Sequence, residues 1–81
     1  RPNAAHKLII NRLGTISKYG QMSDKYSWDL WLKEGERLPS GNNFEEIGYV
    51  QVFGTDPARV LNEASNAAKL FQDTSTISGD N

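Results

Sequence analysis

Two pairs of closely spaced carboxylates have the residue types best suited to chemistry in this chain. Glu34 and Glu36 flank Gly35, and Glu45 adjoins Glu46. Paired carboxylates can act as general acid and base, or bind Mg²⁺ through their oxygens. Paired acids in loops are usually solvent-exposed charges, however, so this spacing alone does not indicate a catalytic site.

Histidine, serine and glycine residues do not form a recognisable site either. His6 is the single histidine, without the three or four ligands that a metal needs or the partner that a general base needs. Ser40 and Ser78 are followed but not preceded by glycine, unlike the serine of a nucleophile elbow. Gly54 lacks the second glycine and the lysine of a phosphate-binding loop, and Asp56 would repel an anion. We therefore predict no catalytic residue, no metal site and no cofactor.

The aromatic side chains suggest binding rather than catalysis. Trp28, Trp31 and Tyr49 could stack on the bases of a single-stranded nucleic acid. Nine basic and ten acidic residues give a net charge of −1, so the positive field that drives nucleic-acid binding is absent. Nucleic acid is therefore not the expected partner. Because residues three apart on a strand point to opposite faces, we expect one tryptophan in the core beneath a helix and the other to need cover from something else.

Length and composition predict one small domain spanning residues 1–81. No stretch reaches the 18 or so apolar residues of a membrane span, and the chain has no cysteine. These features predict a soluble protein without a membrane partner, and they suit a cytoplasmic location. Since the chain begins Arg1-Pro2, without an initiator methionine or a leader, we expect a processed product or a piece of a longer polypeptide.

The first part of the chain allows two structures. Residues 1–6 are expected to be loosely held. Residues 4–13 could form a short helix, or a strand followed by a second short strand at 14–17. The β-branched pair Ile9-Ile10 and the interrupting Gly14 favour strands, because a helix across the glycine would lose about 1 kcal/mol.

Further strands are predicted in the middle of the chain. Residues 18–27 form a polar connection, after which apolar and polar residues alternate from Trp28 to near Gly35, a pattern typical of a half-buried strand. Proline, glycine and asparagine then predict a loop over 35–43, the longest candidate functional loop. Alternation resumes over 47–53, and because both of its faces are largely apolar we predict a central strand.

A helix is predicted from Pro57 to Phe71. Gly54 is expected to take the positive φ of a tight turn, Asp56 to cap the helix, and Pro57 to occupy its first position. Residues 72–81 have one apolar side chain and are expected to be a frayed tail. The apolar stripe of the helix consists of Val60, Leu61, Ala64, Ala67, Ala68 and Phe71.

Together these elements predict an α+β fold, a small antiparallel sheet of three to four strands with one C-terminal helix packed on one face. A single helix leaves the other sheet face bare, and a bare apolar face marks a partner surface. Two arrangements of that face are possible: Val50 and Val52 with Trp31, or Ile47, Tyr49 and Phe53 with Trp28. The candidate partner-binding residues are Trp31, Arg37, Tyr49, Val50 and Val52.

The order of these motifs resembles the small C-terminal subdomain of ATP-grasp ligases of the carboxylate–amine (amino-acid) branch. Ala58-Arg59 departs from that pattern, where an acidic pair follows the proline, and so does Glu46-Ile47, where an arginine usually precedes the strand. The residues that carry the resemblance are Leu13-Gly14-Thr15-Ile16, Gly35-Glu36-Arg37-Leu38-Pro39, Gly48-Tyr49-Val50 and Gly54-Thr55-Asp56-Pro57.

The resemblance implies an accessory role. In such ligases the larger domains bind the nucleotide and magnesium and perform the chemistry, whereas this subdomain packs against them. The chain would then be a non-catalytic docking domain whose partner is protein. The alternative is a free-standing protein-binding module or inhibitor acting through loop 35–43 and the exposed sheet face.

Overall fold

A computed structural model describes residues 3–10, 12–38 and 46–79 of the chain. The fold is α+β, as the sequence predicts, and it is elongated, with dimensions of 46 × 25 × 18 Å. Its elements in chain order are β1 (Asn3–Ile9), β2 (Thr15–Lys18), β3 (Ser27–Leu30), β4 (Glu46–Phe53), α1 (Pro57–Thr74) and β5 (Thr76–Ser78).

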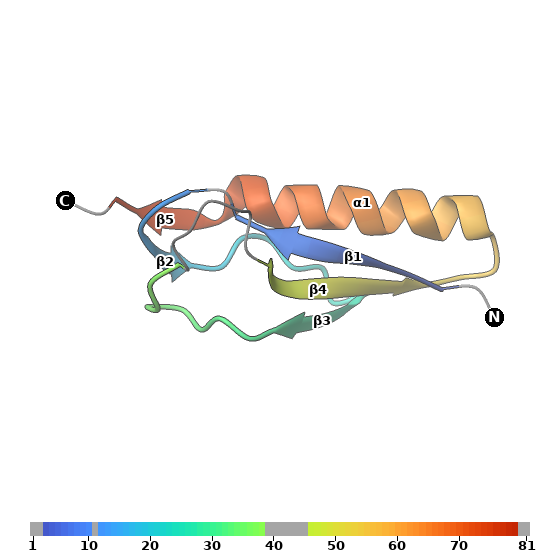
Figure 1. Ribbon diagram of the computed structural model, residues 1–81. Coiled ribbons are helices and arrows are strands. Elements are labelled where there is room, and N and C mark those ends of the chain that lie inside the picture. Colours follow the sequence, from blue (N-terminus) through green and yellow to red (C-terminus); the bar gives the residue numbers. More distant parts are fainter. Residues whose placement is uncertain (1–2, 11, 39–45, 80–81) are drawn as a thin grey trace.

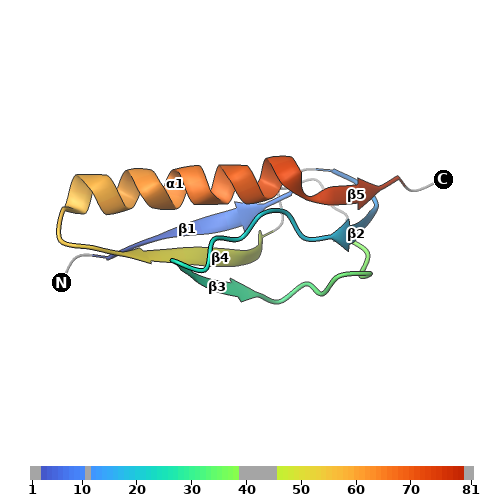
Figure 2. The same ribbon diagram turned by 180° about the vertical axis from the view of Figure 1, so that it is seen from behind.

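The strands form two antiparallel sheets. The larger sheet has the order β1-β4-β3, so β4 is its central strand, as the apolar character of both its faces predicts. The smaller sheet pairs β2 with β5 at one end of the molecule. Helix α1 runs along one side of the larger sheet, and both views of the ribbon place it over β1 and β4 (Figures 1 and 2).

The register of β3 against β4 decides which face each aromatic residue occupies. Trp28 is opposite Val50 and Asp29 is opposite Tyr49. Val50 is fully buried on the helix side, so Trp28 lies on that side too, and its ring centroid is 5.8 Å from that of Phe71. Tyr49 points to the other face because side chains alternate along a strand. Both arrangements expected from the sequence were wrong in the tryptophan they assigned, because Trp28 shares the helix side with Val50 and Trp31 lies with Tyr49. Ile47, expected beside Tyr49 in the second arrangement, is buried in the core.

The start of α1 follows local sequence rules. Asp56 has extended backbone angles and its side chain accepts a hydrogen bond from Ala58 N at 3.1 Å, while Pro57 occupies the first turn. The prediction of a positive φ at Gly54 was wrong, because Gly14 and Gly35 are the described glycines with positive φ. A glycine is favoured at position 54 for a steric reason instead, since a Cβ there would lie 2.6 Å from the Val60 side chain.

Helix α1 buries a narrower stripe than its sequence predicts. Leu61 was expected in the stripe but is 61% exposed. Two alanines, Ala64 and Ala68, are fully buried and let the helix lie close to the sheet, and Phe71 is fully buried beside Leu8 and Val50. The helix residues that the structure buries are Val60, Ala64, Ala67, Ala68 and Phe71.

The two chain ends are more ordered than the sequence predicts. Residues Asn3–His6, expected to be loose, pair with β4 as part of β1. The helix continues to Thr74, and Thr76–Ser78 pair with β2 instead of forming a frayed tail.

Polar groups of the 19–21 segment secure the end of α1. The Ser75 hydroxyl donates to Phe71 O at 2.7 Å and accepts from Gly20 N at 2.9 Å. Thr74 bridges Leu70 O and Gln21 N in the same way. Each hydroxyl thus donates to a carbonyl of the last helical turn and accepts from a loop amide, which ties the 19–21 segment to the end of α1.

Candidate protein-binding face

The face of the larger sheet opposite α1 is the candidate functional site, and we call it the open face. None of the described helices or strands lies against it (Figure 1). It has three rows of side chains set by the register of the strands, and the Trp31 ring adjoins the first row. The rows are Lys7–Tyr49–Asp29, Ala5–Gln51–Ser27 and Asn3–Phe53.

Aromatic side chains give the open face its apolar character. Trp31 is 54% exposed and Phe53 is 48% exposed. The rings of Trp31 and Tyr49 have centroids 6.2 Å apart with a tilt of 59°, a favourable geometry for an aromatic pair. The Trp31 indole N–H donates to Glu46 O at 3.1 Å, which fixes the ring across the end of β4. The Trp31 ring is therefore held in place by these contacts while about half of the residue stays exposed to solvent.

The sequence predictions for this surface are partly corrected. Trp31 and Tyr49 lie together on the open face. Val50 and Val52, predicted as partner-binding residues, are 0% and 2% exposed and pack under α1, so they cannot contact a partner. Arg37 is exposed but lies in the segment that bridges to Thr15 of β2, at the end of the molecule.

Lys7 and Asp29 also belong to the open face, although their sequence context does not single them out. Lys7 lies in a segment whose sequence allows a helix or a strand, and Asp29 is a polar position in an alternating strand. The alternating pattern alone predicts that Asp29 lies on the same face as Trp31, because residues two apart on a strand point the same way. The position of Lys7 could not be predicted in the same way, because it depends on the pairing of β1 with β4, which brings Lys7 opposite Tyr49.

The paired carboxylates hold backbone segments in place. Glu34 accepts a hydrogen bond from Tyr19 N at 2.7 Å, and Glu36 accepts one from Lys33 N at 2.6 Å. Glu46 pairs with Lys7 at 3.1 Å across the edge of the open face. Glu45 lies outside the described residues. The described carboxylates of the two pairs therefore have positioning partners in loops and strands, and nothing brings them together around a common centre.

Other predicted features also have local partners. His6 lies within β1 and its Nδ1 is 2.9 Å from Lys7 O. Within the described ranges, no cluster of three or more histidine, cysteine or acidic side chains could hold a metal ion. In loop 35–43, residues 35–38 lie beside β2, since Gly35 N donates to Ile16 O at 2.8 Å and Arg37 bridges to Thr15. Residues 39–43 are outside the described part of the chain.

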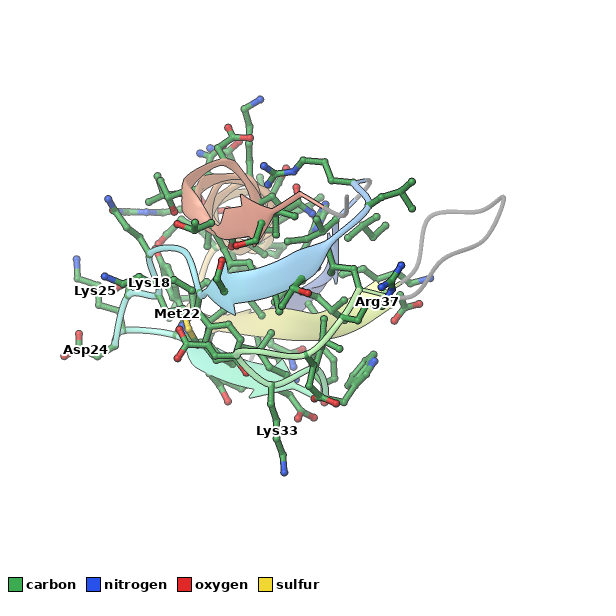
Figure 3. The ribbon with its side chains drawn as sticks, turned by 90° about the vertical axis from the view of Figure 1, so that its left-hand side faces the viewer. Lys18, Met22, Asp24, Lys25, Lys33 and Arg37 are labelled. Atoms are coloured by element: carbon green, nitrogen blue, oxygen red, sulfur yellow. The ribbon has the colours of Figure 1, made fainter. Side chains whose placement is uncertain are left out.

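Basic side chains at the β2–β5 end do not converge. In the end-on view Lys18 and Lys25 lie on one side, Lys33 points down beyond β3, and Arg37 lies on the opposite side (Figure 3). A phosphate or nucleic-acid site needs several such groups aimed at one place. Trp28 is also beneath α1, apart from Trp31, so the three aromatics proposed for base stacking do not form one platform.

Two half-buried tyrosines packed against the core have raised pKa values. Burial, then the nearby Glu34 and Glu36 charges, raises the pKa of Tyr19, whose hydroxyl donates to Leu32 O at 2.6 Å. Burial and a hydrogen bond to Glu63 raise the pKa of Tyr26. Both phenols stay protonated near neutral pH and act as donors that tie loops to the core.

A surface cavity of about 310 Å³ lies where β1 ends beside the last turn of α1. The Arg12 guanidinium at its edge already donates to Gln72 O at 3.1 Å, and Asp73 lies 4.0 Å from Lys69. Both charged side chains at the cavity thus already contact another group of the chain. Its lining residues are Ile9, Ile10, Arg12, Gln72 and Asp73.

Comparison of the chain with known protein families, curated proteins and solved structures gives no match. No helix in the described part of the chain is long and apolar enough to cross a membrane. The open face is therefore the feature from which a function can be inferred.

Proposed function

We propose that this chain is a non-catalytic docking domain that binds a protein partner through the open face. The supporting observation is the pair of exposed aromatics, Trp31 and Phe53, on a sheet face that no described helix or strand covers. Exposed aromatic area flanked by polar residues is typical of the anchors at protein interfaces. Lys7 and Asp29 on the two edge strands supply polar groups at a rim.

The docking domain could have two forms. As an accessory subdomain of an ATP-grasp-like ligase, it would press the open face against the larger domains of one polypeptide, and the motif resemblance supports this form. As a free-standing module, it would bind a separate chain. The coding sequence around this chain separates them, because the ligase form requires nucleotide-binding grasp domains in the same reading frame.

Site-specific photo-crosslinking tests the docking function directly. A photo-reactive phenylalanine analogue would replace Trp31 on the open face and, as a matched control, Leu61, which is similarly exposed on the outer surface of α1. We expect a discrete protein adduct in cells from position 31 and none from position 61. The adduct's mass identifies the partner. Equal, diffuse crosslinking from both positions would contradict a docking role for the open face.

A further inference from the structure

The charge pattern of the open face is self-complementary. Its first row places a cation at the β1 edge, Tyr49 in the centre and an anion at the β3 edge. Lys7 and Asp29 are both exposed. Lys7 pairs with Glu46 at 3.1 Å, whereas Asp29 has no ion pair or side-chain hydrogen bond within the described ranges. The row therefore has a basic side chain at the β1 edge, which would exchange Glu46 for a new acidic partner, and an acidic side chain without an ion pair in the described ranges at the β3 edge.

A twofold axis parallel to β4 would superimpose opposite ends of this row. Rotation about such an axis, placed between two stacked sheets, keeps the strand direction and exchanges the β1 and β3 edges. Lys7 of each copy then faces Asp29 of the other, and Tyr49 faces Tyr49. Stacked sheets lie about 10 Å apart, a gap that the side chains of lysine and aspartate together can span.

The second row fits the same operation. Ala5 on β1 would face Ser27 on β3, and both side chains are small. Gln51 in the centre would face Gln51 of the other copy, and two amides related by a twofold axis can each donate to and accept from the other. An isologous interface requires this kind of self-complementarity, with one patch serving both partners.

We infer that the open face binds a second copy of this chain, forming a twofold sandwich with reciprocal Lys7–Asp29 ion pairs. This inference rests on the proposed docking function and specifies the partner of its free-standing form. The strands β1, β3 and β4, of seven, four and eight residues, cover about 300 Å² per copy, from the usual strand spacing and rise. That is less than half the area per partner of a standard stable interface, so the dimer is weak, with micromolar affinity at best.

Charge reversal with mixing tests the inference. Sedimentation equilibrium over micromolar to millimolar concentrations would be measured for the wild type, Lys7→Glu and Asp29→Lys. Each variant has two like-charge contacts across its own twofold, so we expect about tenfold weaker self-association. Mixing the two variants restores both opposite-charge contacts, and we expect heterodimers about as stable as the wild-type dimer. No contact within one chain can produce that recovery.

The Lys69–Asp73 pair on the outer surface of α1 provides the matched control. Lys69→Glu and Asp73→Lys make the same charge changes, and we expect wild-type association from each and no gain on mixing. Circular dichroism confirms that all variants fold. A wild type that stays monomeric, a mixture that does not recover, or an effect of Lys7→Glu without one of Asp29→Lys would overturn the inference. An adduct of Trp31 with another protein, beside a monomeric wild type, would overturn it while leaving the docking function intact.

Discussion

Trp28 and Trp31 are three residues apart and lie on opposite faces of the same sheet. Trp28 packs on Phe71 beneath α1, and its indole N–H donates to Ser23 O at 2.8 Å. Trp31 contacts Tyr49 on the open face and is 54% exposed. The same side chain therefore contributes to stability on one face and to a candidate binding surface on the other. The difference comes from the single helix, which covers one face and leaves the other exposed.

The largest loss of stability is expected from a substitution at the centre of the face that α1 covers. Phe71 is fully buried and its ring contacts those of Trp28 and Tyr19. Phe71→Ala should lower the free energy of unfolding by about 3–5 kcal/mol, because it removes apolar burial and leaves a cavity. Urea denaturation measures the loss, and Phe71→Leu, which fills most of the space, should retain much of the stability. A loss below about 1 kcal/mol for the alanine variant would contradict this packing.

The two tryptophans test the comparison most directly. Trp28→Ala should cost about 2–3 kcal/mol, since it removes a half-buried side chain and its hydrogen bond. Trp31→Ala should cost less than about 1 kcal/mol, because most of its surface is already in water. Thermal unfolding of the two variants provides the measurement. Similar losses would mean that Trp31 is a structural residue and would weaken the docking proposal.

A smaller effect is expected from the start of the helix that covers the sheet. Asp56→Ala removes the side-chain acceptor for Ala58 N and should lower the free energy of unfolding by about 1 kcal/mol. Asp56→Asn keeps an oxygen acceptor and should be nearly neutral. Hydrogen exchange should speed up in the first turn of α1 in the alanine variant, while the open face is unchanged. An unaltered exchange rate would mean that Pro57 and packing alone define the helix start.

The smallest change in stability is expected from the ionisation of Tyr26 at high pH. The pKa of Tyr26 in the folded state is raised by burial and by Glu63, above the value near 10 of an unfolded tyrosine. The unfolded state then loses its proton first as pH rises, so stability is fully present below pH 10 and falls as pH approaches the folded pKa. Denaturation midpoints from pH 8 to 11 measure this, and Tyr26→Phe should flatten the decline.

Local sequence features predicted much of the fold. The Asp56-Pro57 pair defines a helix start because its capping and φ preferences are intrinsic to those residues. The apolar character of both faces over 47–53 predicted a central strand, and β4 is central. Strands over the first 18 residues were favoured by Ile9, Ile10 and Gly14, and β1 and β2 confirm them.

Non-local contacts explain the errors. Neighbouring residues on a strand point to opposite faces of the sheet, and this follows from the sequence alone. Which of the two faces is buried depends on where the helix packs. Leu61 belongs to the apolar stripe by spacing, yet only the narrower strip through Ala64 and Ala68 is buried under the helix. The tail was expected to fray because it is polar, but β5 is held by backbone pairing with β2, which its own composition cannot reveal.

The sequence by itself determined the fold class, the capped helix and the central strand, because each depends on periodicity or on the conformational preference of a few neighbouring residues. The tertiary structure decided which face is left exposed and forms the candidate binding surface. Pairing of β1, β4 and β3 brought Lys7, Tyr49 and Asp29 into one row, although they are far apart in the chain. Packing of α1 buried Val50 and Val52 and left Trp31 exposed, since one helix can cover one side of a sheet.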